Sequence, residues 1–219
     1  MLWWAGLVSF MSDQSVSRAG RRIGVLVSGR GSNLQALIDA VADGRLQATI
    51  AVVLSNVADA PALARAASAG IETVVASHRG WPSREAYDEH LVAALRARDV
   101  DVVCLAGFMR RLSERFFERF GGPVLNVHPS LLPAFPGVAA PEQALAHGVR
   151  VAGCTVHLVT PELDAGPIVR QAAVPVHAGD SAESLAARIL VEEHRLLPAA
   201  VALVLAGGWR LDGRRFVDA

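Results

Sequence analysis

The stretch "RIGVLVSGRGSNLQALIDAVADG", residues 22–44, joins an apolar run to a helical pattern through a glycine-rich turn. The run at 22–28 resembles a strand buried on both faces of a parallel sheet, and the helical pattern ends at a glycine. The alternation then recurs, with strand-like runs at 49–55, 72–76, 100–107 and 123–128 and helical patterns at 60–70 and 83–99, the last opening on Ser83 as an N-cap. This order predicts an α/β fold with an open, mostly parallel twisted sheet and helices on both faces, Rossmann-like in organisation.

The later third of the chain changes this pattern. Two strand-like segments, 151–160 and 168–177, are separated only by the turn-rich "PELDAGP". Because no crossover helix lies between them, we expect them to pair antiparallel as a hairpin at one edge of the sheet. A long helix from about Ser181 follows, with Pro198 as a point where it can bend and Gly207 as its stop.

Composition limits the classes of function. The chain has 219 residues, 52% of them hydrophobic, and its 21 basic residues balance 21 acidic ones. A net charge of zero gives no general reason to expect a nucleic acid or a membrane as partner, so a charged ligand must be bound by local groups. The two cysteines show neither disulfide nor metal-site spacing, which favours a reducing, cytoplasmic location.

The domain organisation is read from the same sequence. No internal repeat or linker is visible, so we expect one domain over residues 21–219. The first ten residues, "MLWWAGLVSF", are apolar but short and lack a basic region before them, which fits neither a membrane-spanning helix nor a secretory signal. Residues 1–20 are expected to form a disordered extension, with an extra strand or helix packed on the domain as the alternative.

The turn "SGRGSNL", residues 28–34, is the first candidate ligand site. The free N–H groups and the dipole of a helix beginning here favour an anion such as phosphate. A dinucleotide fingerprint would need glycine where Leu34 stands, and the lysine of a phosphate-binding P-loop is absent. We therefore expect a phosphorylated small molecule, although similar glycines also occur in strand-to-helix turns that bind nothing.

The fifth strand-like run leads into "NVHPSLLPAFPG", residues 126–137, at the edge of the sheet where open α/β folds bind ligands. Asn126 and His128 are two residues apart in an extended segment and project on the same side. An amide donor beside a histidine suits a reaction that builds negative charge on a carbonyl oxygen and delivers a proton to a leaving nitrogen. The alternative is structural: Asn126 caps a turn, and His128 only hydrogen-bonds within the loop.

Asp164 lies in the second polar insert, "PELDAGP". Beside His128, its carboxylate would hold the tautomer of the ring and favour the imidazolium form. Asp-Ala-Gly turns also occur for conformational reasons alone, and spacing does not show whether Asp164 and His128 meet.

Several motifs together resemble the phosphoribosylglycinamide formyltransferase family, folate-dependent enzymes of de novo purine synthesis. They are, in order, "SGRGSNLQALID", "SREAYD", "LAGFMRRLS", "LNVHPSLLPAFPG", "GCTVHLVTPELDAGPIVRQAAVPV" and "EEHRLLP". The resemblance extends from Arg22 to about Pro198. It implies a phosphate-binding N-terminal half and a folate-binding, catalytic C-terminal half.

The resemblance implies formyl transfer from 10-formyltetrahydrofolate to the amine of N1-(5-phospho-D-ribosyl)glycinamide, here called glycinamide ribonucleotide, with no metal. It makes Asn126, His128 and Asp164 the catalytic residues, the first two stabilising the oxyanion. The substrate contacts that it implies are Gly31, Ser32 and Asn33 for the phosphate and Glu193 for the ribose. The partners would be small molecules, and the protein a monomer or homodimer.

The resemblance also implies a folate site. Its contacts would be Arg84, Met109, Arg110, Arg111, Leu112, Asn126, Thr160, Pro161, Glu162, Leu163 and Asp164. Residues 109–112 would meet the pterin, Arg84 would lie near the glutamate end, and residues 160–164 would form the opposite wall. The alternative for the arginines is an ordinary surface charge, and for His157, near Asp164, a supporting role competes with a buried structural one.

One departure from the family pattern is "VAAPEQAL", residues 138–145, where relatives often carry histidine or other polar residues. We expect altered loop contacts there with the chemistry retained. Formyltetrahydrofolate hydrolase and methionyl-tRNA formyltransferase share the Asn, His and Asp arrangement, but their additional domains are not expected in a chain of this length. A catalytically silent nucleotide-binding domain is the alternative from another class.

Overall fold

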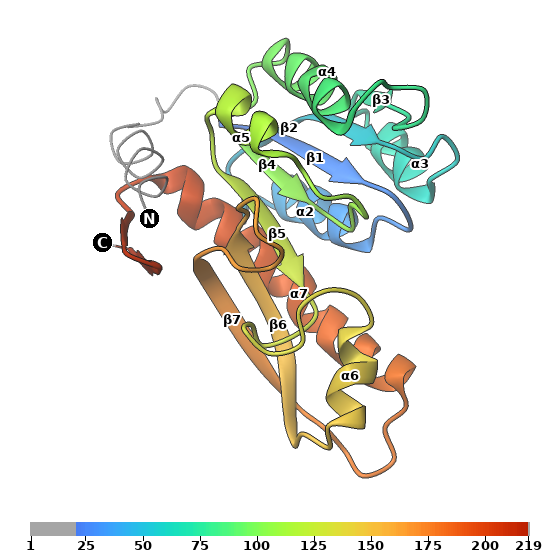
Figure 1. Cartoon of the computed structure of the whole chain (residues 1–219), viewed down its shortest axis with the longest axis vertical. Coiled ribbons are helices and arrows are strands. Elements are labelled where there is room, and N and C mark those ends of the chain that lie inside the picture. The colour runs from blue at the N-terminus through green and yellow to red at the C-terminus, as the bar shows by residue number, and fades with distance from the viewer. Residues whose placement is uncertain (1–20, 219) are drawn as a thin grey trace.

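The computed structural model describes residues 21–218, so the extension predicted at 1–20 lies outside the described residues. The first half builds a parallel sheet from β1 (Arg22–Val27), β2 (Thr49–Ser55), β3 (Thr73–Val75), β4 (Val102–Leu105) and β5 (Val124–His128). Their order in the sheet is β3-β2-β1-β4-β5 (Figure 1). β2 and β3 thus lie on one side of β1, and β4 and β5 lie on the other, so the order in which strands are added reverses between β1 and β4. This confirms the predicted fold class, and the reversal creates a crevice at the carboxyl ends of these strands.

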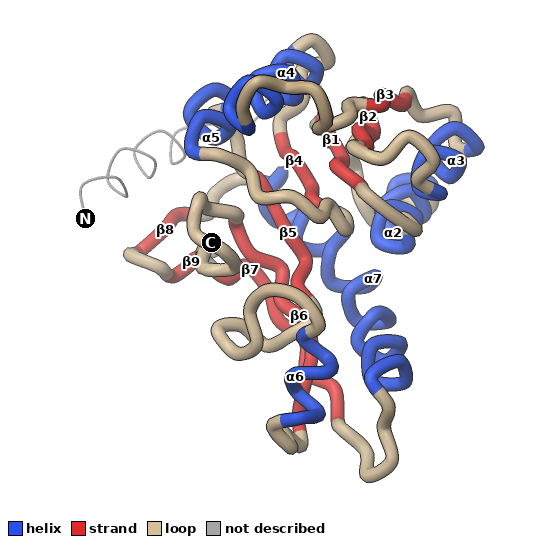
Figure 2. Tube along the Cα trace, turned by 45° about the vertical axis from the view of Figure 1, so that its right-hand side comes forward, coloured by secondary structure: helices blue, strands red, loops and turns tan. Residues whose placement is uncertain are grey.

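The second half extends the sheet with antiparallel strands. β6 (Val151–Leu158) pairs with β5, and β7 (Ile168–Pro175) pairs with β6, as the sequence predicts. The sheet does not end at β7, because β9 (Arg215–Val217) pairs with it and carries β8 (Arg210–Asp212) as the last strand (Figure 2). This C-terminal hairpin was not predicted, since its two strands have only three residues each.

The helices cover both faces of the sheet. α2 (Ser32–Ala42), α3 (Pro61–Ser68), α6 (Ala140–Ala146) and α7 (Ala182–Ala206) pack on one face, and α4 (Arg84–Arg96) and α5 (Glu114–Phe120) on the other (Figure 1). Each face of the sheet has its own hydrophobic core, and alternate residues of β1 pack in the two cores. Val25 packs in the core with α2 and α7, and Leu26 packs in the core with α4 and α5. The continuous apolar strands predicted from the sequence are explained by this two-sided burial.

Local signals set the helix ends. The hydroxyl of Ser83 accepts a hydrogen bond from the N–H of Ala86, so the predicted N-cap of α4 is confirmed. Ser181 and Ser184 form a reciprocal capping box at the start of α7, which continues through the buried Pro198 and ends at Gly207. α7 lies beside α2 and packs on β6 and β7, and thereby joins the two halves (Figures 1 and 2).

Candidate active site

The pairing of β5 with β6 places four polar side chains on one face of the sheet. Asn126 is the register partner of His157, and His128 is the partner of Thr155. Residues opposite one another in an antiparallel pair project to the same face, and so do residues two apart along a strand. The predicted common side of Asn126 and His128 is therefore present, and His157 is added to it.

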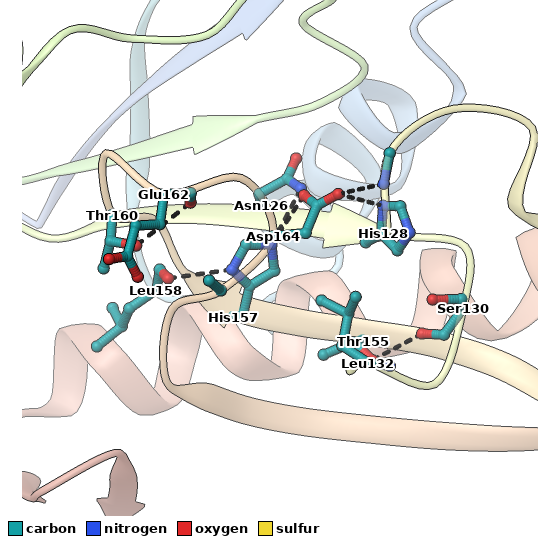
Figure 3. A network of polar contacts seen from close by, with 12 residues as sticks. Asn126, His128, Ser130, Leu132, Thr155, His157, Leu158, Thr160, Glu162 and Asp164 are labelled. Carbon is teal, nitrogen blue, oxygen red and sulfur yellow. Dashed lines mark hydrogen bonds and ion pairs between the residues drawn. The ribbon is translucent and has the colours of Figure 1, made fainter. Parts of the chain in front are cut away.

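The loop between β6 and β7 brings Asp164 onto this face (Figure 3). Its Oδ2 lies 3.5 Å from Nδ1 of His128 and accepts a 2.8 Å hydrogen bond from the N–H of Gly137. Its Oδ1 lies 3.8 Å from Nε2 of His157. The side chain of Asp164 is only 9% exposed, so the carboxylate meets His128 largely shielded from solvent.

Both ring nitrogens of His128 face oxygen acceptors. Nε2 lies 2.9 Å from the carbonyl oxygen of Phe135, and Nδ1 faces the carboxylate of Asp164. A neutral imidazole carries a proton on one nitrogen only, whereas the imidazolium donates from both. The surroundings of His128 therefore suit a proton donor.

His157 fixes the orientation of the Asn126 amide. Its Nδ1 lies 3.0 Å from the carbonyl oxygen of Leu158, which can only accept, so Nδ1 carries the proton. Burial lowers the pKa of His157, against the opposing effects of that carbonyl and of Asp164, so the ring is favoured in its neutral form. Nε2 is then an acceptor for the amide nitrogen of Asn126 at 3.2 Å, and a second N–H of that amide remains for a ligand.

The first pocket lies between the glycine-rich turn and α7 and has a volume of about 600 Å³. It is lined by Ser28, Gly29, Arg30, Gly31, Ser32, Asn33, Ala106, Gly107, Met109, Val127, Pro129, Pro141, Glu183, Ala186, Ala187, Leu190 and Glu193. Gly31 precedes α2 in a left-handed conformation, at φ 73°, and no side chain caps the first turn. The free N–H groups of this helix start are therefore available to an anion.

All four residues expected to hold the substrate line this pocket, namely Gly31, Ser32, Asn33 and Glu193. The amide nitrogen of Asn33 donates a 2.7 Å hydrogen bond to Glu193, and its buried Oδ1 has no partner among the described residues. Burial raises the pKa of Glu193, while the hydrogen bond from Asn33 opposes that shift. The amide of Asn33 on α2 and the carboxyl group of Glu193 on α7 are thus hydrogen-bonded to each other in the lining of the first pocket.

The second pocket, of about 100 Å³, lies on the other side of β5. Its lining is Leu105, Phe108, Arg110, Arg111, Leu112, Asn126, His157, Val159, Thr160, Pro161, Glu162, Leu163 and Asp164. Two segments of this lining, 110–112 and 160–164, are linked by Arg111, because its guanidinium donates a 3.0 Å hydrogen bond to the carbonyl of Pro161. The segments 110–112 and 160–164 therefore face one another, as the resemblance implies.

Two predicted folate contacts lie elsewhere. Met109 lines the first pocket and is 73% exposed. Arg84 lines a neighbouring cavity of about 420 Å³, which shares Arg111, Leu112 and Pro161 with the second pocket. The second pocket and this cavity are therefore neighbours, and Arg84 lines only the latter.

The unusual segment 138–145 lies at the first pocket. Ala139 adopts a left-handed conformation at φ 58°, and Pro141, in the first turn of α6, lines the pocket. The side-chain amide of Gln143 donates a 2.8 Å hydrogen bond to the carbonyl of Val138, which ties the loop to the helix. The altered residues thus adjoin the predicted substrate side of the site.

Two kinds of structural feature are absent from residues 21–218. No group of three or more His, Cys, Asp or Glu side chains has the arrangement of a metal site in this part of the chain. None of its helices combines the length and the apolar character required to span a bilayer.

Comparison with known proteins agrees with this geometry. The sequence model described as formyl transferase matches residues 21–201. The chain belongs to the formyl transferase family. It is 48% identical over 190 residues to phosphoribosylglycinamide formyltransferase of Escherichia coli strain K12, a match that covers 87% of each chain. The family resemblance read from the motifs is thereby confirmed.

Two other relatives extend this comparison. The crystal structure of glycinamide ribonucleotide transformylase 1 from Symbiobacterium toebii superposes with a TM-score of 0.89 at 49% identity, covering 94% of this chain and 97% of that one. The human trifunctional purine biosynthetic protein adenosine-3 is 47% identical over 199 residues, which are 91% of this chain. That match spans only 20% of the human protein, so this formyl transferase chain corresponds to a small part of it.

Proposed function

We propose that this formyl transferase moves a formyl group from 10-formyltetrahydrofolate to the amine of glycinamide ribonucleotide, a step of de novo purine biosynthesis. One observation carries the proposal: Asn126, His128 and Asp164 gather at the boundary of two pockets of different character. Val127 and Pro129 line the first pocket, whereas Asn126 and Asp164 line the second. Groups on one short segment of β5 can therefore act on two ligands at once.

The first pocket fits a phosphorylated amine. A phosphate at the start of α2 would accept hydrogen bonds from the N–H groups of Ser32 and Asn33, since no side chain competes for them. Glu193 lies within the same pocket and offers carboxyl oxygens to ribose hydroxyl groups. The amine would then lie near Asn126 and His128.

The second pocket fits a flat heteroaromatic group. Leu105, Phe108 and Val159 supply apolar surface, and the segments 110–112 and 160–164 supply backbone donors and acceptors. Bound there, the folate supplies the formyl carbon and a nitrogen, N10, that leaves with a proton. Arg84 and Arg111 in the adjoining cavity suit the carboxylates of its glutamate end.

The residues present account for the proton and charge balance. The amine nitrogen forms a bond to the formyl carbon, and the bond from that carbon to N10 breaks. The free N–H of Asn126 and the imidazolium of His128 stabilise the negative charge on the formyl oxygen. Asp164 holds His128 in its donor form, and the proton released by the amine passes to N10 through these groups and water.

An assay with purified protein, 10-formyltetrahydrofolate and glycinamide ribonucleotide tests the proposal by following tetrahydrofolate release with and without the nucleotide. We expect release that depends on the nucleotide. Nucleotide-independent release would indicate a hydrolase, and binding without turnover would indicate a silent nucleotide-binding domain. We place the protein in the cytoplasm as a monomer or homodimer; its two cysteines, both buried and unpaired, support a reducing location.

A further inference from the structure

The first pocket has an uneven distribution of charge. Of the described residues that line it, Arg30 alone is a cation, whereas Glu183 and Glu193 are acidic. The N–H groups at the start of α2 offer only a partial positive charge, equivalent to about half an elementary charge. A further positive group would stabilise a phosphate dianion in this pocket, and Arg30 is the one on its described lining.

Two residues of α3 hold the backbone of the turn around Arg30 in place. Nε of Arg65 donates a 2.9 Å hydrogen bond to the carbonyl oxygen of Arg30, and the N–H of Ala62 donates to Gly29 at 3.1 Å. Gly31 lies so close to Ala62 that an added Cβ would come within 2.6 Å of the Ala62 Cβ. The turn therefore has a defined position before any ligand binds.

The side chain of Arg30 is free within this fixed frame. It is exposed and forms no hydrogen bond or ion pair with another residue of the described chain. Arg65 lines a neighbouring cavity together with Arg45 and Arg195, and its guanidinium also reaches Oε1 of Gln35 at 3.3 Å. Arg30 can thus turn toward a ligand without breaking an existing contact, while Arg65 holds the turn.

We infer that Arg30 binds the substrate phosphate and sets the preference of the site for a phosphorylated over an unphosphorylated substrate. The inference rests on the proposed function and adds Arg30 to the Gly31, Ser32 and Asn33 turn. An arginine can form two parallel hydrogen bonds to phosphate oxygens, and such charged pairs are stronger than neutral hydrogen bonds.

The test compares Arg30→Gln with Arg96→Gln, which removes an exposed arginine at the end of α4, away from the pocket lining. Arg30→Gln is expected to raise the KM for glycinamide ribonucleotide by about tenfold or more, the loss typical of one charge-assisted contact. The kcat and the KM for 10-formyltetrahydrofolate should remain close to wild type. Arg96→Gln should change none of these constants.

A substrate that lacks the phosphate, glycinamide riboside, separates direct contact from a general disturbance of the pocket. Its kcat/KM should be equal in wild type and Arg30→Gln, and calorimetry should show weaker binding of inorganic phosphate to the variant. An unchanged KM for the nucleotide, or an equal loss with the riboside, would overturn the inference. If wild type binds the nucleotide but transfers no formyl group, the proposed function fails, and the same calorimetry still tests Arg30.

Discussion

Oδ2 of Asp164 lies 3.5 Å from Nδ1 of His128. The same oxygen accepts the N–H of Gly137, so one carboxylate contacts both the His128 ring and the loop that follows β5. Replacing the carboxylate by an amide should therefore lower the rate of the reaction more than it disturbs the loop, because the amide oxygen can still accept the hydrogen bond from Gly137.

Asp164→Asn is expected to lower kcat by about 10² to 10⁴, the range in which a positioned acid or base contributes. The KM values for both substrates should change little, since asparagine keeps the size of this side chain in the second pocket and its bond to Gly137. Steady-state kinetics with both substrates varied measures this split. A kcat near that of wild type would show that the carboxylate does not support His128.

His128→Ala should abolish most turnover while the nucleotide still binds, because the ring supplies a proton and charge stabilisation and lies beside the lining of the first pocket. Calorimetric titration with glycinamide ribonucleotide measures binding, and tetrahydrofolate release measures turnover. His90→Ala is a suitable control, since His90 lies on α4 and lines neither pocket. Retained turnover in the His128 variant would contradict the assigned role.

His157 is expected to act by positioning the Asn126 amide. His157→Phe removes the acceptor for the Asn126 N–H and should lower kcat about tenfold or more, whereas His157→Gln keeps an acceptor and should lose less. In the wild type, ¹⁵N NMR should show the neutral Nδ1–H tautomer at pH 7. An Nε2–H tautomer, or equal kcat in the two variants, would contradict this role.

The sequence predicts the parallel half of the fold well because burial on both faces leaves a clear apolar signal, as in residues 22–27. The β6 and β7 hairpin is also predicted, since only a turn separates its strands. The C-terminal hairpin is missed because a three-residue strand carries too little pattern.

The catalytic residues can be proposed from motifs, but their contacts depend on the register of β5 with β6 and on the course of two loops. Residue spacing does not predict that Asn126 lies opposite His157, or that Gly137 shares the carboxylate of Asp164. Arg30 stands inside a predicted motif, yet only the structure shows that it is the one cation among the described residues lining the first pocket.

Glu193 provides a prediction about pH and stability. Burial raises its pKa from the usual 4.5, so the folded state disfavours the ionised form and loses stability relative to the unfolded state as pH rises through the raised pKa. Glu193→Gln removes this dependence, and its carbonyl can still accept the Asn33 N–H. In urea unfolding, the free energy of unfolding of the variant relative to wild type should be higher at pH 8 than at pH 4. An equal difference in the free energy of unfolding at both pH values would contradict the raised pKa of Glu193.

Gly31 is expected to tolerate no side chain. Its φ of 73° is unfavourable for other residues, and a Cβ there would lie 2.6 Å from the Cβ and 2.8 Å from the Cα of Ala62. Gly31→Ala should lower the free energy of unfolding by about 1–3 kcal/mol through strain and a displaced α3, and should weaken nucleotide binding. Gly29→Ala is the matched control, because nothing lies within 4 Å of an added Cβ there. Equal stability of the two variants in urea would show that the contact between the turn and α3 does not fix the position of the turn.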